Sequence, residues 1–177
     1  MQAPTGAIGV GPLSGASVGL GLSVGFEHTG WQLQLQGLAW KRQNVPASGF
    51  PGYGADVGRI SGRFWACHET RLLWLGLSPC LVGGMERVSV SGTGNNIVST
   101  TRHTIGASAG AGIQGRIRLA SWIRVLAAVG GEIELVRPQI SIDGLGQLAP
   151  SPTDPPTPIY RFAPAALTAT LSLEWVL

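Results

Sequence analysis

The chain has 177 residues, of which 27 are glycine and only 12% are charged, and its formal net charge is +3. A soluble domain of this size carries about twice that charged fraction, so the composition argues against an ordinary soluble protein. Mean hydropathy is positive at +0.24, yet no run of about 18 apolar residues is present to form a transmembrane helix. We therefore expect a membrane protein without spanning helices, folded as one domain over residues 1–177.

Charge and cysteine usage exclude several kinds of site. All but one of the basic residues are arginines, and they are scattered singly, whereas a nucleic-acid-binding protein clusters them. We expect no nucleic-acid partner. Cys67 and Cys80 form no CxxC or Cys/His pattern, so no metal and no cofactor are expected. No signal peptide follows Met1, so an exported protein would be represented here by its mature chain.

The stretch from Trp31 to Gln36 alternates strictly between apolar and polar residues. In a β-strand this puts Gln32, Gln34 and Gln36 on one face and the apolar side chains on the other. The same period of two recurs along most of the chain and predicts eight strands. In chain order they are Thr5–Pro12, Ser17–Glu27, Gly30–Arg42, Ala55–His68, Leu72–Val90, Arg102–Leu119, Ile123–Arg137 and Tyr160–Leu177.

The predicted connections alternate in length. Short turns follow the second, fourth and sixth strands, at His28–Thr29, Glu69–Arg71 and Ala120–Trp122. Long connections follow the third, fifth and seventh strands, at Gln43–Gly54, Ser91–Thr101 and Pro138–Ile159. Bacterial outer-membrane barrels alternate short periplasmic turns with long extracellular loops in this way. The fifth and sixth strands are longer than a membrane requires, and we expect them to project beyond it.

The two faces of the predicted strands differ in a way that suits lipid. One face is rich in Leu, Val, Ile and Ala, and the other is mostly Gly, Ser, Thr and Gln. A water-exposed face normally carries frequent Lys and Glu, whereas small polar residues fit the crowded lumen of a narrow barrel. In lipid all backbone polar groups must be satisfied, which requires closure of the sheet. The sequence therefore predicts an all-β fold, an eight-stranded antiparallel up-and-down transmembrane β-barrel.

The end of the chain carries a resemblance to a known family. Leu171, Leu173, Trp175 and Leu177 are apolar at alternating positions up to the last residue. This is similar to the C-terminal signal of small eight-stranded bacterial outer-membrane barrels of the OmpA/OmpX-like type, although Leu177 replaces the usual terminal aromatic. The resemblance implies an outer-membrane location, with the lipid bilayer and the barrel assembly machinery as partners. The chain also resembles glycine-rich barrels that carry a cysteine on each of two central strands, which implies no activity.

Ionisable residues on the predicted inner faces form a candidate lumen charge cluster. Those nearer the short turns are Glu27, Arg116, Arg118, Arg124 and Glu174, and those further from them are Arg59, Arg63, Glu86, Glu132 and Glu134. Arg118 should lie opposite Arg124, so Glu174 or Glu27 must be close enough to neutralise the pair. The cluster is either an ion-paired plug or a gated ion path. We favour the plug because eight strands leave room only for side chains.

Aromatic residues predict one edge of the membrane. Phe26, Trp31 and Trp175 face outward beside the short turns, where an interfacial girdle is expected. Trp40 and Trp74 fall on inward positions and are expected to fill space in the lumen.

Cys67 and Cys80 share the inward face and are a candidate disulfide, since an oxidising compartment favours pairing. A regular hairpin at Glu69–Arg71 would however put Cys67 opposite Trp74, about 20 Å from Cys80 at the usual strand rise. That distance is too long for a disulfide. Either the two cysteines are unpaired, or Glu69–Pro79 is not a regular hairpin.

Three functions fit these patterns. The first is a non-enzymatic outer-membrane barrel, acting as a structural protein or as the membrane anchor of a longer polypeptide. The second is a soluble lipocalin-like carrier, which would need an apolar lumen and a polar exterior. The third is a lipid-modifying enzyme with His103, Ser99 and Asp56 near its outer rim. Their mutual geometry is not fixed by sequence, so no catalytic residue is assigned.

Overall fold

The computed structural model describes residues 2–10, 15–46, 52–70, 77–93, 101–137, 139–142, 157–161 and 163–175. Its strands are β1 (Gln2–Val10), β2 (Ala16–His28), β3 (Trp31–Pro46), β4 (Gly54–His68), β5 (Leu77–Thr93), β6 (Thr101–Arg118), β7 (Ile123–Val136), β8 (Gln139–Ile142), β9 (Thr157–Arg161) and β10 (Ala165–Trp175). The described residues contain no helix that is long and apolar enough to cross a membrane.

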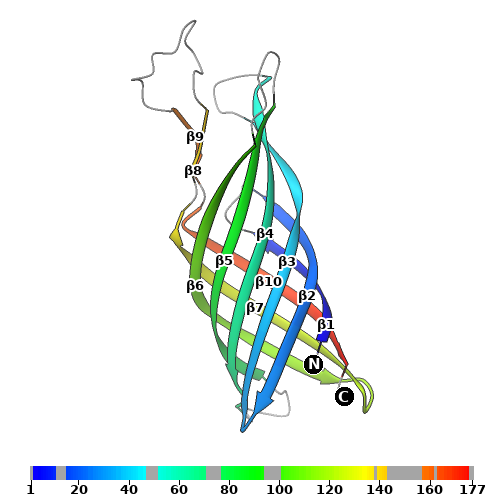
Figure 1. Cartoon of the computed structure of the whole chain (residues 1–177). Helices are drawn as coiled ribbons and strands as arrows, with labels where there is room; N and C mark the ends of the chain where they lie inside the picture. The colour runs from blue at the N-terminus through cyan, green and yellow to red at the C-terminus, as the bar shows by residue number, and fades with distance from the viewer. Residues whose placement is uncertain are drawn as a thin grey trace, which may run out of the picture.

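Eight of these strands close into a barrel in the order β1-β10-β7-β6-β5-β4-β3-β2, and every neighbouring pair is antiparallel. The predicted eight-stranded all-β barrel is confirmed. The closing seam joins β1 to β10, where the hydroxyl oxygens of Thr5 and Ser172 lie 2.9 Å apart. Strands β8 and β9 form a separate hairpin outside the barrel (Figure 1).

Side chains alternate between the outer surface and the lumen as the sequence predicts. On β2, Leu20 is 74% exposed on the outside while Ser23 is 5% exposed on the inside. The predicted inward residues Gln32, Gln34 and Gln36 of β3 are all buried. The barrel is thus apolar outside and polar inside, the arrangement expected for a barrel in lipid.

The turn between β2 and β3 is a two-residue hairpin. Thr29 and Gly30 both have positive φ, at 45° and 78°, which is the geometry of a type I′ turn. The predicted turn at His28–Thr29 is therefore one residue too early. This turn type matches the right-handed twist of the two strands and keeps the connection short.

Two predicted strands begin in the wrong place. Strand β5 begins at Leu77 rather than Leu72, and Trp74 lies outside the described residues. The last barrel strand begins at Ala165 rather than Tyr160. Tyr160 does lie in a strand, but it pairs with Ile140 in the β8–β9 hairpin, within a connection that was predicted to be a loop. The alternating pattern identifies strand conformation and not the partner strand.

A β-bulge lies in β3 at Lys41–Arg42. Trp40 pairs with Arg59 of β4, and Gln43 is the next residue to pair, with Val57. Three steps along β3 therefore match two along β4, which adds one residue and shifts the inward positions from even to odd numbers. Trp40 and Val45 are consequently both buried inside the barrel.

The loop ends of β3, β4, β5 and β6 rise beyond the rest of the barrel as a tall projection (Figure 1). The sequence predicted a projection of the fifth and sixth strands only. The part formed by β3 was missed, because β3 continues through a bulge past Arg42, where the predicted strand ends. Inside the projection Val45, Ala55, Val57 and Val88 pack into an apolar cluster. The interior of the projection is thus apolar, whereas the lumen of the rest of the barrel is polar. An apolar interior is expected for a segment surrounded by water.

Candidate functional site in the barrel lumen

The inward residues of β4 give the order of layers in the lumen. From the loop end they are Ala55, Val57, Arg59, Ser61, Arg63, Trp65 and Cys67. The lumen therefore passes from the apolar cluster through an upper charged layer to an aromatic layer and the cysteines. A second charged layer follows near the short turns.

The upper charged layer contains two ion pairs. Arg59 Nη1 lies 3.5 Å from Glu86 Oε2, and Arg63 Nε lies 2.9 Å from Glu132 Oε1. The second pair joins β4 to β7, which are three strands apart, so it crosses the lumen. The side chain of Glu132 is only 2% exposed. A buried charge of this kind is tolerated only with a partner, because desolvation of an unpaired charge costs several kcal/mol or more.

Hydroxyl groups and an indole complete the upper layer. Arg59 donates to Ser17 Oγ at 3.2 Å, Arg63 donates to Thr168 Oγ1 at 3.0 Å, and Ser108 donates to Glu132 Oε2 at 2.7 Å. The guanidinium carbons of the two arginines lie 4.7 and 5.5 Å from the ring centre of Trp40, within cation–π range. Trp40 fills space in the lumen, as predicted, and it also interacts with both arginines.

Glu134, the remaining member of this layer, is half-buried and forms no ion pair within the described residues. It lines a cavity of about 20 Å³, together with Arg59, Arg63 and Glu86. A cavity needs about 10–15 Å³ to hold one water molecule. The space left in the upper layer is therefore of the order of one water.

The lower charged layer is centred on Glu27. Its two carboxylate oxygens accept from Arg116 at 2.9 Å and from Arg124 at 3.3 Å. Arg118 lies opposite Arg124 in the β6–β7 register, as expected from the turn, and Glu174 lies opposite Arg124 on its other side. Arg118 is exposed and forms no ion pair within the described part of the chain. Glu27 and Glu174 thus offset the repulsion between Arg118 and Arg124. Both glutamates were predicted for this role from the sequence.

A tryptophan that sequence reasoning missed fills the middle of the lumen. Trp65 is 1% exposed. A Cβ built on Gly112 of β6 or Gly130 of β7 would lie 2.9 Å from its ring. The indole therefore occupies space that exists only because both facing residues are glycine. The signal available in the sequence was the inward position of Trp65 together with the inward glycines on the later strands.

The disulfide lies next to Trp65. Cys67 of β4 and Cys80 of β5 are direct cross-strand partners, with their Cα atoms 4.0 Å apart, and the structure joins them in a disulfide. The assumption that Cys67 lies opposite Trp74 is wrong, because β5 begins only at Leu77. Of the two alternatives, Glu69–Pro79 is therefore not a regular hairpin, since Cys67 pairs directly with Cys80.

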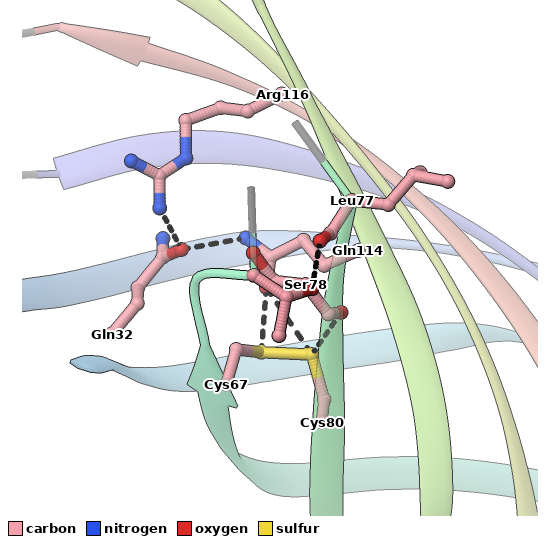
Figure 2. The surroundings of a disulfide bond; sticks show 8 residues. Gln32, Cys67, Leu77, Ser78, Cys80, Gln114 and Arg116 are labelled. Carbon is pink, nitrogen blue, oxygen red and sulfur yellow. Dashed lines mark hydrogen bonds between the residues drawn. A yellow bond between two sulfur atoms is a disulfide. The ribbon is translucent and has the colours of Figure 1, made fainter. Parts of the chain in front are cut away.

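Figure 2 shows Gln114 beside this disulfide and Gln32 hydrogen-bonded to Gln114. Gln114 Oε1 lies 2.9 Å from Cys67 Sγ, a close contact and not a hydrogen bond, because a disulfide sulfur has no proton to donate. Gln114 donates to Gln32 Oε1 at 3.0 Å, and Arg116 donates to the same oxygen. The disulfide is thereby connected through Gln114 and Gln32 to the lower charged layer.

Aromatic residues lie on the outer surface beside the short turns. The predicted girdle residues Phe26, Trp31 and Trp175 are 64%, 50% and 41% exposed. Trp122 in the β6–β7 turn is 56% exposed as well. The sequence analysis did not include it among the girdle residues, because it was assigned only to a turn. Trp31 packs edge-on against His68 with ring centres 4.9 Å apart. This arrangement is the one expected of an interfacial belt.

The proposed assembly signal lies on β10. Leu171 and Trp175 are exposed on the outer surface, Leu173 is half-buried between them, and Leu177 lies outside the described residues. The chain thus presents an apolar outer face on its last strand.

Two of the three rim residues named from the sequence, His103 and Asp56, lie within the described residues. His103 is exposed on β6, Asp56 accepts a hydrogen bond from Asn44 at 2.9 Å, and Ser99 lies outside the described residues. Within the described ranges, no group of three His, Cys, Asp or Glu side chains is placed to hold a metal ion.

Comparison with known proteins places the fold. No protein-family model and no curated protein sequence matches the chain. A major outer-membrane protein of Thermus thermophilus is similar in structure, with a TM-score of 0.59 and 12% identity over 99% of each chain. Ail, the attachment invasion locus protein of Yersinia pestis, has a TM-score of 0.53 and 13% identity over 98% of this chain and 94% of its own. The chain therefore has the fold of the small eight-stranded barrels of bacterial outer membranes.

Proposed function

We propose that the chain is a non-enzymatic β-barrel of the bacterial outer membrane whose lumen is plugged by its own side chains. It serves as a structural protein or as the membrane anchor of a longer polypeptide. The observation that carries the proposal is the inverted polarity of the barrel. Leu20 and Leu22 of β2 are 74% and 70% exposed on the outside, whereas Gln34 and Gln36 of β3 are buried inside.

This polarity argues against a soluble carrier. A lipocalin-like protein keeps an apolar lumen for its ligand and a polar surface for water. Here ion pairs such as Arg63–Glu132 occupy the lumen, and rows of leucine, valine and isoleucine cover the outer surface. Contiguous apolar surface of this extent is unstable in water and stable in hydrocarbon.

The layered contents of the lumen support a plug rather than an ion path. Trp40 and Trp65 are 7% and 1% exposed inside the barrel, and the cavity beside Glu134 measures about 20 Å³. A hydrated ion is larger than the single water that such a cavity accommodates. On the loop side of both tryptophans, the apolar cluster around Val57 adds a further barrier to ions.

A structural role also fits the rim. Ser89 is the cross-strand partner of His103, but its hydroxyl donates to the carbonyl oxygen of Gly58 at 3.2 Å, and Asp56 is bonded to Asn44. The apolar outer face of β10, with Leu171 and Trp175, supports recognition by the barrel assembly machinery. The bilayer and this machinery are the partners that we propose.

Three measurements test the proposal together. The chain should require detergent or lipid, and unheated samples should migrate faster on a gel than boiled ones. Folded protein in planar bilayers should show no large steady conductance. A protein that is monodisperse in plain buffer would refute the membrane location, and a large open-channel current would refute the plug and favour the gated ion path.

A further inference from the structure

The outer surface of the barrel changes from apolar to polar at one level on β4, β5 and β6. The last apolar row contains Ile60 and Ile105, which are 63% and 61% exposed, with Arg87 paired between them. One row nearer the loops, the paired outward residues are Gly58, Ser89 and His103. The edge of the hydrocarbon layer is expected where outward apolar side chains give way to polar ones.

Three cations lie at this level on the outside, and we call Lys41, Arg42 and Arg87 the boundary cations. All three are exposed, and none forms an ion pair within the described ranges. The bulge in β3 brings Lys41 and Arg42 together at the boundary. The Arg42 side chain passes across Gly58, where an added Cβ would lie 3.7 Å from both Cγ and Nε. The Arg42 side chain thus reaches from β3 over β4.

The opposite edge of the barrel has a different chemistry. Beside the short turns, the outward described residues include four aromatic ones, Phe26, Trp31, Trp122 and Trp175. The two membrane edges are therefore unlike, one aromatic and one cationic.

We infer that the boundary cations form a docking surface for the phosphate groups of lipid headgroups in the leaflet on the loop side. The inference rests on the proposed membrane location. Long Lys and Arg side chains keep their stems against apolar surface while their charged ends reach the headgroup level. A guanidinium binds phosphate through paired, charge-assisted hydrogen bonds. A lipid suits the site better than free phosphate, because Ile60 and Ile105 flank Arg87 and need acyl chains to cover them.

The test measures lipid retained by the folded protein in neutral-detergent micelles, by native mass spectrometry, with phosphatidic acid and phosphatidylcholine compared. The unmodified protein should prefer phosphatidic acid. Each cation near an anionic surface contributes about a fivefold gain in affinity, so Arg87→Gln should weaken phosphatidic acid binding by about that factor. The variant with Lys41→Gln, Arg42→Gln and Arg87→Gln should weaken it on the order of a hundredfold. Binding of phosphatidylcholine should not change, because its phosphate is neutralised by its own choline and the headgroup has no net charge.

Arg118→Gln is the matched control, since it removes one exposed arginine at the other end of the barrel and should leave the preference intact. Folding of every variant is verified by its heat-dependent gel migration. A folded protein that retains both lipids equally, or whose lipid is displaced by inorganic phosphate, would overturn the inference while leaving the proposed function standing. A protein that needs no detergent would instead overturn the proposed function.

Discussion

Trp65 of β4 lies directly over Gly130 of β7 on the far side of the lumen, and a Cβ added to Gly130 would lie 2.9 Å from the indole Cη2. The adjacent Gly131 faces outward, with no other atom within 4 Å of the position of its Cβ. Gly130→Ala should therefore overpack the lumen and lower the free energy of unfolding by roughly 1–3 kcal/mol. Gly131→Ala should leave it nearly unchanged. Urea unfolding in lipid vesicles measures both, and equal effects would mean that Trp65 moves aside at little cost.

The ion pair between Arg63 and Glu132 is the second target. Glu132→Ala leaves Arg63 buried without its partner and removes the acceptor of Ser108, so we expect a loss of about 3–5 kcal/mol. Glu69→Ala removes an exposed carboxylate outside the strands and should change stability by less than about 1 kcal/mol.

A double-mutant cycle distinguishes pairing from packing at this site. The variant Arg63→Met with Glu132→Ala should lose less than the sum of the two single changes, because neither charge is then left unpaired. Additive losses would show that water reaches the upper layer and screens the pair.

The outer surface should tolerate charge according to depth. Ala111 lies on the outer face of β6 near the middle of its apolar band, where arginine costs roughly 2–4 kcal/mol. Leu119 lies at the short-turn end of the same band and is 63% exposed, so arginine there should cost about 0–1 kcal/mol. Folding yield in vesicles, read from gel migration, should fall for Ala111→Arg only. Similar yields for both variants would contradict the position of the membrane.

The disulfide should be resistant to reductant in the folded state. Cys67 and Cys80 are 0% and 5% exposed, and Gln114 covers them from inside the lumen. Thiol labelling after mild reductant should appear only with unfolding. Replacing both cysteines by serine should lower the free energy of unfolding by about 3 kcal/mol, because the bond closes a loop with a sequence separation of 13. Rapid labelling of the folded protein would show an open lumen on the short-turn side.

The number of barrel strands and the direction of their side chains followed from the sequence because both depend on local alternation. Alternation over Trp31–Gln36 depends only on the pleat, and the structure keeps it. The bulge at Lys41–Arg42 was not predicted, since one extra polar residue at the end of an alternating run leaves no trace in the pattern. The start of β5 was wrong for a related reason, because apolar residues after Arg71 extended the alternation into a connection.

Contacts across the lumen could not be predicted from the pattern. Arg63 and Glu132 were both assigned to the lumen, but their pairing depends on the stagger of strands that are three apart in the sheet. The role of Trp65 in filling the lumen was missed for the same reason, since the glycines that it packs against, Gly112 and Gly130, come from β6 and β7. Local sequence determines which face a residue occupies, and closure of the sheet determines what it meets there.

The seam between β1 and β10 has a consequence for how the molecule forms. The contact between Thr5 and Ser172 joins residues 167 positions apart in the chain. Contacts between such distant residues form slowly, because the intervening chain must first be brought together. Until β10 has been synthesised, β1 and β7 each have one unpaired edge, and unpaired backbone edges are costly in hydrocarbon. Closure of the barrel therefore has to wait for β10, which pairs with both β1 and β7.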